Sequence, residues 1–171
     1  NASCISVNDV VVHGIPSLQV VNDGDIVSVD ITALFKGYQG DAARTFAVGN
    51  VSAQNLALID AAKAAFFAGL EYAKAGNRVG DVSGAIQLYT ELKGYGVVRA
   101  LTGHGIGRQM HEPPELPNFG RSGTGVTLKN GMCLAIEPMI TAGDWRVKVE
   151  RDKWTVRTAD GRLSAHYENT I

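Results

Sequence analysis

The sequence has little cysteine and no long apolar run. Its two cysteines, Cys4 and Cys133, form no disulfide framework, which favours a reducing compartment over secretion. The apolar runs are too short and too interrupted to span a bilayer, so no membrane partner is predicted. We therefore expect a cytoplasmic protein, or an organellar one if a targeting segment has been removed.

An excess of either charge is also missing. Sixteen Lys and Arg residues against seventeen Asp and Glu residues give a formal net charge of −1. Because nucleic-acid binding relies on a basic surface, this balance predicts no DNA partner and gives no sign of a basic surface for RNA. A hydrophobic content of 45% over 171 residues is sufficient for one domain with its own core.

Two common catalytic signatures are absent. The glycines around His104 lack the Lys-Ser/Thr ending of a phosphate-binding loop, and no serine stands in a nucleophile elbow. Phosphoryl transfer on such a loop and Ser-His-Asp catalysis are therefore not predicted.

The strongest positive signal is a predicted β-hairpin. Residues 26–33 alternate as in a strand, with Asp30 and Thr32 on one face and apolar residues on the other. A turn at residues 36–37 pairs Thr32 with Asp41, so Asp30 and Asp41 become diagonal neighbours with Cβ atoms roughly 7 Å apart. Two carboxylates at this separation repel each other unless a cation lies between them. Two solvated acids on an edge hairpin are the alternative.

Histidines mark a second group of polar residues. Glycines flank His104, so neighbouring backbone can approach closely and the imidazole is unshielded. His111 follows seven residues later, which would place the two side chains on opposite faces of a straight strand, and the glycines argue against a helix. We therefore expect a bend between them. His13 directly follows a predicted strand over residues 6–12, where a structural role is the alternative to a functional one.

Two further acids belong to predicted strands, one at a strand end and one within a strand. Glu137 lies six residues after Gly131, as Asp30 lies six residues after Gly24, and each strand between them is mostly apolar. This repeat is consistent with two related halves that each donate acids to a shared site. Glu168 lies on a predicted last strand over residues 163–171, where an exposed acid is the alternative.

The rest of the chain predicts an α+β protein. A first helix follows an N-cap at Ser52 and ends at Gly76, and a second helix follows a cap at Asp81 and ends at Gly94. Three prolines predict an irregular loop over residues 113–117.

Together these residues form a donor set for divalent metal ions. Four carboxylates and one imidazole suit two ions such as Mn, Fe, Co or Zn. Two ions about 3.5–4 Å apart share a hydroxide and clamp a substrate oxygen, which is hydrolase chemistry. The five donors are Asp30, Asp41, His104, Glu137 and Glu168.

The motifs that carry these donors resemble the type I methionine aminopeptidases. The matching segments include CISVNDVVVHGIP, DGDIVSVDITALFKGYQGDAARTFAVG, GHGIGRQMH, GMCLAIEPMI, KWTVRT and LSAHYENTI. The short interval between Glu137 and Glu168 is similar to type I, because type II enzymes carry a helical insertion there. The resemblance implies the pita-bread fold, with two pseudo-symmetric halves of helices around a curved antiparallel sheet.

The resemblance also implies the roles of the metal ligands. Asp30 would chelate one ion, Asp41 and Glu168 would bridge both, and His104 and Glu137 would complete the other. A hydroxide shared by the ions would attack the carbonyl after an N-terminal methionine. Members of the family remove the initiator methionine when the second residue is small.

Other positions are similar to the family's substrate site. Glu137 would take the proton of the attacking water, His111 would bind the scissile carbonyl, and His13 would hydrogen-bond the scissile amide nitrogen. Thr32 would lie behind the metal ligands, near the free amine of the substrate. Three residues resemble wall positions of the methionine pocket: Cys4, Met110 and Trp154.

The sequence departs from the family pattern in a few places. The family usually has a further helix and strand before Cys4 and another strand after Ile171. We therefore expect residues 1–171 to be a single catalytic domain that lacks those segments. Met110 stands where an aromatic residue is common, which would widen or soften the pocket.

Two alternatives stay open. Proline-specific aminopeptidases and prolidases use similar ligands, although they normally add an N-terminal domain and differ around GHGIG. A catalytically inactive module that binds RNA or protein would have lost ligands, whereas all five are present. For the aminopeptidase, the implied partners are the N-terminus of a peptide or nascent chain and the ribosome as a docking surface, with the chain a monomer.

Overall fold

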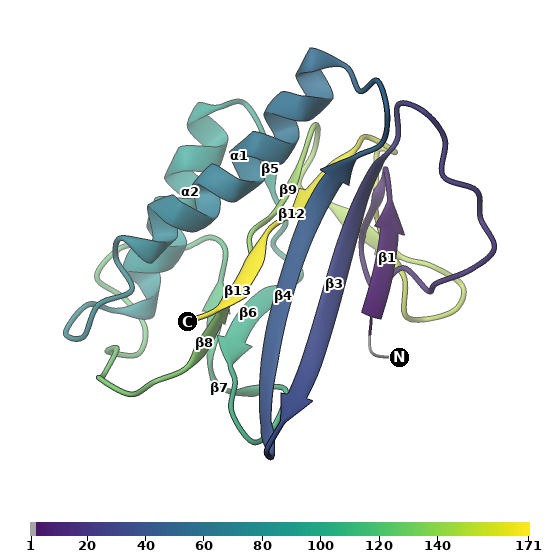
Figure 1. Cartoon of the computed structure of the whole chain (residues 1–171). Coiled ribbons are helices and arrows are strands. Elements are labelled where there is room, and N and C mark those ends of the chain that lie inside the picture. Colours follow the sequence, from purple (N-terminus) through teal and green to yellow (C-terminus); the bar gives the residue numbers. More distant parts are fainter. Residues whose placement is uncertain (1–2) are drawn as a thin grey trace.

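The computed structural model describes residues 3–171 and confirms the α+β class (Figure 1). Its largest sheet contains seven strands whose neighbours are all antiparallel. In spatial order these are β1 (Ser3–Val7), β3 (Ile26–Phe35), β4 (Tyr38–Ala47), β13 (Glu168–Thr170), β8 (Leu134–Ile136), β6 (Thr102–Gly105) and β7 (Glu112–Pro117).

Two three-stranded sheets extend this sheet. One contains β10 (Val147–Val149), β11 (Val156–Thr158) and β2 (Val10–Val12). The other contains β12 (Ser164–His166), β9 (Met139–Thr141) and β5 (Gly96–Val97). The chain passes repeatedly between the large sheet and the small ones, so β1 and β2, β8 and β9, and β12 and β13 lie in different sheets although each pair is consecutive in sequence.

These crossings divide two strands that the sequence predicts as continuous, over residues 6–12 and 163–171, and a third crossing follows β8. The strand over residues 6–12 is interrupted between β1 and β2, where Asn8 adopts φ +57°. The strand that leads to Glu137 ends at Ile136 of β8, and β9 begins at Met139 after Pro138, which provides no N–H for the ladder. The last strand is divided at Tyr167 between β12 and β13. Glu137 and Glu168 therefore lie where the chain changes sheets.

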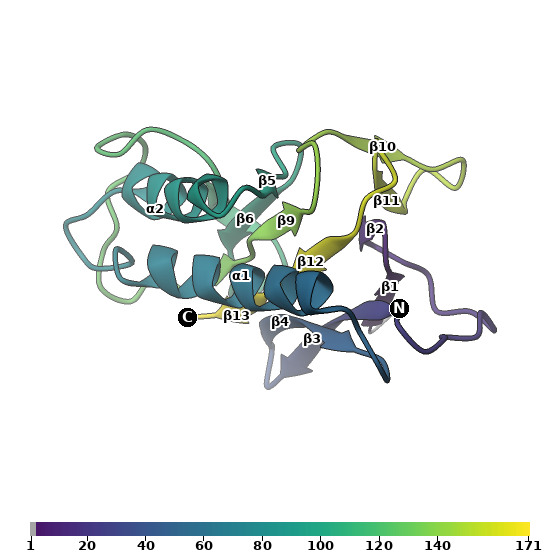
Figure 2. The same ribbon diagram turned by 90° about the horizontal axis from the view of Figure 1, so that it is seen from above.

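Two helices, α1 (Ala53–Leu70) and α2 (Val79–Leu92), lie side by side over one face of the sheets (Figures 1 and 2). The predicted cap of α1 is confirmed, since the Ser52 side chain accepts from the Asn55 N–H at 3.2 Å. The predicted start of α2 is wrong by three residues. Arg78 is the N-cap, and Asp81 reaches back to accept from the Arg78 N–H at 2.7 Å.

The helices are fixed by apolar contacts with the central strands. Phe66 of α1 and Ile86 of α2 are fully buried in one core cluster with Leu134 and Ile136 of β8. Burial of such side chains stabilises the fold by about 1.5–3 kcal/mol each. The helix layer therefore holds β8 in place, and with it the strand exit that carries Glu137.

The predicted irregular loop over residues 113–117 is wrong. This segment is β7, which pairs with β6 at the edge of the large sheet. An edge strand has hydrogen-bond partners on one side only, so prolines are tolerated there. The strand packs beside His104, because Glu115 is the residue opposite that histidine.

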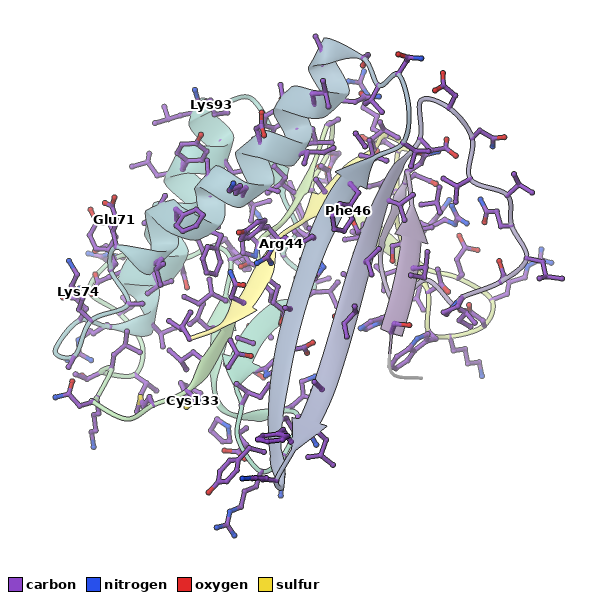
Figure 3. All side chains as sticks on the ribbon, in the orientation of Figure 1. Arg44, Phe46, Glu71, Lys74, Lys93 and Cys133 are labelled. Atoms are coloured by element: carbon purple, nitrogen blue, oxygen red, sulfur yellow. The ribbon has the colours of Figure 1, made fainter. Side chains whose placement is uncertain are left out.

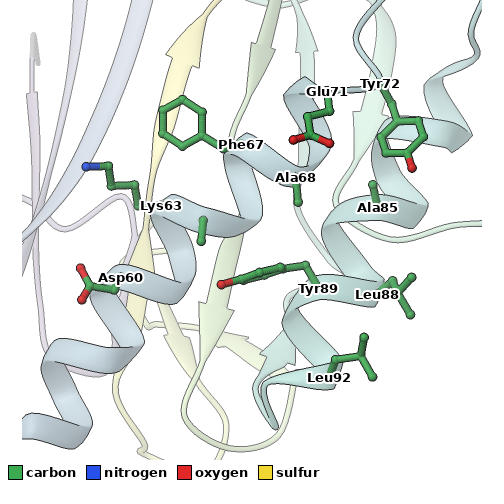
Figure 4. A pocket seen from close by; sticks show the side chains of 11 residues that line it. Asp60, Lys63, Phe67, Ala68, Glu71, Tyr72, Ala85, Leu88, Tyr89 and Leu92 are labelled. Carbon is green, nitrogen blue, oxygen red and sulfur yellow. The ribbon is translucent and has the colours of Figure 1, made fainter.

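The helix layer also carries a groove on its own surface (Figure 4). The groove has a volume of about 620 Å³ and is lined by 11 residues that lie within the spans 60–72 and 85–92, with Phe67, Tyr89 and Leu92 among them. None of the predicted metal ligands borders it. Within residues 3–171, neither helix has the length and apolarity needed to cross a membrane.

Candidate metal centre

The β3–β4 hairpin forms in the predicted register. Thr32 pairs with Asp41 and Phe35 with Tyr38, so Asp30 and Asp41 share one face as diagonal neighbours. The Thr32 hydroxyl donates to Asp41 Oδ1 at 3.2 Å. Strand alternation and a two-residue turn therefore place the first two carboxylates without help from the rest of the chain.

β13 brings a third carboxylate to this hairpin. Glu168, its first residue, pairs with Ala43 of β4 and is only 2% exposed. Arg44 projects from β4 toward β13 (Figure 3), where it donates to the Glu168 carbonyl and lies 3.9 Å from the Tyr167 ring. These contacts fix the backbone of β13 against β4, so the Glu168 side chain is held beside the two aspartates.

The glycines beside His104 are required by the close approach of neighbouring strands. A Cβ added at Gly103 would clash with the carbonyl oxygen of Ala135 in β8. One added at Gly105 would clash with the carbonyl oxygen of Pro113 in β7. The Gly-His-Gly segment therefore allows β6 to lie tightly between β7 and β8 while its histidine points into the site.

The orientation of His104 suits a metal ligand. Its Nδ1 lies 2.8 Å from the Gly105 carbonyl oxygen, and a carbonyl can only accept, so Nδ1 carries the proton. The other nitrogen, Nε2, then has a lone pair, and it lies 3.5 Å from Glu137 Oε1. Asn118 donates to the Glu137 carbonyl at 2.9 Å and fixes the strand exit from which this acid projects.

Donor atoms of these side chains gather in two groups that share Glu168. The first contains Asp41 and His104 together with Glu168, and the second contains Asp30 and His166 together with Glu168. Within each group all donor atoms lie within 4.8 Å of one another. The structure thus brings all five predicted ligands together, Glu137 through its contact with His104, and this set of oxygen and nitrogen donors fits divalent metal ions.

Burial and mutual repulsion dominate the electrostatics of the acids. Burial, with the neighbouring Asp41 charge, raises the pKa of Asp30 to about 7. Burial, with the charges of Glu137 and the aspartates, raises the pKa of Glu168 to about 10. The same two causes raise the pKa of Glu137 well above its ordinary value. Without a cation this cluster holds protons at neutral pH, and a divalent ion would replace them.

The predicted bend between His104 and His111 is confirmed. β6 has an irregularity between His104 and Gly105, and the two imidazole rings lie 4.4 Å apart by their centroids at an angle of 68°. Burial lowers the pKa of His104. His111 is exposed and therefore lies on the solvent side of the donor cluster, where a substrate would arrive.

His13 and Trp154 form a stacked pair, and His13 is close enough to His111 for that histidine to influence its pKa. The stacked rings have centroids 4.3 Å apart and an interplanar angle of 15°. His13 adopts φ +62° directly after β2, and burial lowers the pKa of its imidazole. Trp154 remains 53% exposed. The indole thus presents one face to His13 and leaves the rest of its surface open to solvent.

The remaining predicted residues lie around the cluster. Cys4 of β1 is the cross-strand partner of Asp30 and shares its face of the sheet. Burial, followed by the Asp30 charge, raises the pKa of the Cys4 thiol. Met110 is partly buried in the bend directly before His111.

Sequence reasoning missed His166. This residue ends β12, is 2% exposed, and places Nε2 3.9 Å from Glu168 Oε2 and 4.0 Å from Glu137 Oε2. Burial lowers the pKa of its imidazole to about 3. A signal was available, because a residue two positions before Glu168 on an extended chain shares its face.

Carboxylates and imidazoles gathered beside one antiparallel sheet are the donors that hold divalent ions in metal-dependent hydrolases. The model of "Metallopeptidase family M24" matches residues 1–171. A methionine aminopeptidase of Clostridium acetobutylicum is 56% identical over 169 residues, which cover 98% of this chain and 68% of that protein. The chain therefore belongs to metallopeptidase family M24, among its methionine aminopeptidases.

Solved structures support the same assignment and separate the alternatives. The crystal structure of a methionine aminopeptidase from Thermotoga maritima matches with a TM-score of 0.97 and 48% identity, over 99% of this chain and 68% of that one. An Xaa-Pro dipeptidase from Bacillus anthracis matches with a TM-score of 0.78 and 29% identity, over 100% of this chain and 43% of that one. The pita-bread fold is shared by both, whereas the likeness to the aminopeptidase is greater.

Proposed function

We propose that this chain, as a methionine aminopeptidase, removes the N-terminal methionine from peptides and nascent proteins whose second residue is small. The observation that carries the proposal is the buried cluster in which one glutamate joins two groups of donors. The acids of this cluster hold protons in the absence of a cation, and both oxygen and imidazole donors are present. Such a site fits a divalent ion far better than it fits water.

Two divalent ions are the proposed cofactors. Asp30 would hold one ion, Asp41 and Glu168 would bridge both, and His104 and Glu137 would complete the other. The mixture of carboxylate and imidazole donors favours Mn, Fe, Co or Zn over Mg or Ca. When bound, the ions supply Lewis acidity at the scissile carbonyl and lower the pKa of the attacking water.

The protein's own residues carry the proton transfers and the orientation of the substrate. Glu137, with its raised pKa, takes a proton from the attacking water and passes it to the departing amine. His111 lies on the solvent side of His104 and donates to the carbonyl oxygen as negative charge develops there. His13 hydrogen-bonds the scissile amide nitrogen, and its stacking on Trp154 keeps the ring in place.

The methionine side chain would be bound beside these histidines. Cys4 on the Asp30 face, Met110 before His111 and the open indole of Trp154 form the proposed walls of the pocket. The thioether of Met110 and the thiol of Cys4 are soft and polarisable, which suits contact with another thioether. Thr32 supports Asp41 and would lie near the substrate's free amine.

The wider setting is proposed by analogy with the family. Residues 1–171 would act as one catalytic domain and as a monomer in the cytoplasm, with access to nascent chains at the ribosome. The substrate in every case is the free N-terminus of a polypeptide.

The decisive experiment is release of methionine from Met-Ala-Ser. The protein is stripped with a chelator, and Mn, Co, Fe or Zn is added back singly before the assay. We expect release that depends on the added metal, and no hydrolysis of an Xaa-Pro peptide under the same conditions. Cleavage of the Xaa-Pro peptide alone would replace the proposed substrate class with that of the prolidases.

A further inference from the structure

We propose that His166 is a positioning residue, which directs one oxygen each of Glu137 and Glu168 away from the metal ions. The proposal rests on the metal centre proposed above. It concerns a residue that contacts the ligands rather than the ions or the substrate.

A side chain as buried as His166 needs a hydrogen-bond partner for its ring nitrogens. The side chain lies at the end of β12 beneath the donor cluster and is 2% exposed. Within residues 3–171, neither Nδ1 nor Nε2 has a hydrogen-bond partner at ordinary distance. Buried polar atoms in folded proteins are nearly always satisfied, and an exception points to a ligand or a functional role.

The nearest acceptors of His166 are two of the proposed metal ligands. Nε2 lies 3.9 Å from Glu168 Oε2 and 4.0 Å from Glu137 Oε2. A bound ion would replace the protons of these acids, and an ionised carboxylate can only accept, so the nitrogen that faces both acids would then carry the proton. One N–H would therefore point between the two glutamates.

The two oxygens of Glu137 face different histidines. Oε1 lies 3.5 Å from Nε2 of His104, whose lone pair is directed to the metal site. Oε2 lies on the other side, toward His166. A hydrogen bond from His166 to Oε2 would fix the orientation of the Glu137 carboxylate. Oε1 would then stay beside His104, where both atoms could bind the same ion. Partners of this kind behind a ligand typically change metal affinity by 10–100-fold.

The present distances are about 1 Å longer than a hydrogen bond. A small rotation of either carboxylate closes the gap. We therefore expect these contacts to shorten when ions bind the glutamates. The hydrogen bond of His166 would then contribute to metal affinity rather than to the stability of the fold.

The test compares two substitutions at this position. His166→Gln retains an amide N–H near the place of Nε2, whereas His166→Leu removes every donor at similar volume. Ser164→Ala, two residues earlier on the same strand, is the matched control. Its hydroxyl donates to the Ile140 carbonyl at 2.9 Å and touches no acid of the site. Circular dichroism and thermal melting establish that each variant folds.

Calorimetric titration with MnCl₂ gives the main measurement, and the absorption spectrum of the Co²⁺-loaded protein gives the coordination. We expect His166→Leu to weaken Mn²⁺ binding by about 10–100-fold, as for other partners behind metal ligands. His166→Gln should restore affinity to within a few-fold of the parent chain, and Ser164→Ala should leave it unchanged. The Co²⁺ spectrum should keep its shape in all variants.

Three results would overturn the proposal. Equal Mn²⁺ affinity in His166→Leu and the parent chain would show that the histidine is only a space filler. A Co²⁺ spectrum that loses one nitrogen ligand in both variants would make His166 a ligand itself, as its grouping with Asp30 and Glu168 also allows. Absence of Mn²⁺ binding by the parent chain would refute the metal centre, and this role with it.

Discussion

His104 Nε2 and Glu137 Oε1 lie 3.5 Å apart, although the two residues come from different strand ends. Two donors at this separation can bind one ion from adjacent positions. The pair is held by backbone contacts on both sides, since His104 pairs with Ala135 only two residues before Glu137. Removal of either side chain therefore tests the site without removing the strand that carries it.

Glu137→Ala should abolish methionine release from Met-Ala-Ser. Loss of a general acid–base group typically costs about 10²–10⁴-fold in rate. Some metal should stay bound through Asp30 and Asp41, which calorimetry with Mn²⁺ would show. Glu115→Ala is the matched control, because this exposed glutamate lies opposite His104 on β7. Parent-level turnover in Glu137→Ala would refute the assigned role.

Thr32→Val should weaken metal binding by about tenfold, as expected for a partner behind a ligand. The hydroxyl that donates to Asp41 Oδ1 at 3.2 Å is lost while the side-chain volume is kept. Thr32→Ser retains the donor and should behave like the parent chain in the same Mn²⁺ titration. Identical affinities for all three proteins would mean that the hydrogen bond supports only the hairpin.

Trp154→Ala should remove the ring on which His13 stacks and so make the orientation of the His13 imidazole less fixed. Stacked aromatic pairs contribute about 0.5–1.5 kcal/mol, so kcat/KM should fall by about 2–10-fold, whereas Trp154→Phe should keep most of the activity. Since burial lowers the pKa of His13, exposure of its ring should raise that pKa toward the ordinary value. NMR titration of the His13 imidazole measures the shift, and an unchanged pKa would contradict this account.

The metal-stripped chain should lose stability as the pH rises from 7 to 9. Glu168, with its pKa raised to about 10, stays protonated in the folded state but ionises in the unfolded state. The folded state then binds more protons, so the free energy of unfolding falls by about 1.4 kcal/mol per pH unit for each such group. The lowered pKa of His166, about 3, acts with the opposite sign, but only below about pH 6.5.

Urea unfolding at pH 7, 8 and 9 measures this slope. Saturating Mn²⁺ should flatten or reverse it, because the ion takes the place of the protons. Glu168→Gln in the stripped protein removes one of these protons, so the fall in the free energy of unfolding should be smaller by about 1.4 kcal/mol per pH unit. A flat profile in the stripped parent chain would mean that the acids are already ionised and satisfied without metal.

Local patterns predicted the elements that depend on near neighbours in sequence. The hairpin register followed from alternation and a turn at residues 36–37, and the cross-strand pairing of Thr32 with Asp41 is as predicted. The bend between His104 and His111 followed from their odd spacing and the glycines. In contrast, β7 was missed because its prolines exclude a central strand, and only the sheet order makes it an edge.

The sequence by itself therefore determined the family, the hairpin and the chemical kind of each donor, because these depend on residue types and short spacings. The tertiary structure alone decided which donors meet. Asp41 and His104 are 63 residues apart, and they share a donor group with Glu168 only because β13 and β8 lie between their strands in the sheet. It also decided the place of His166, since burial against two acids arises from packing that no local pattern encodes.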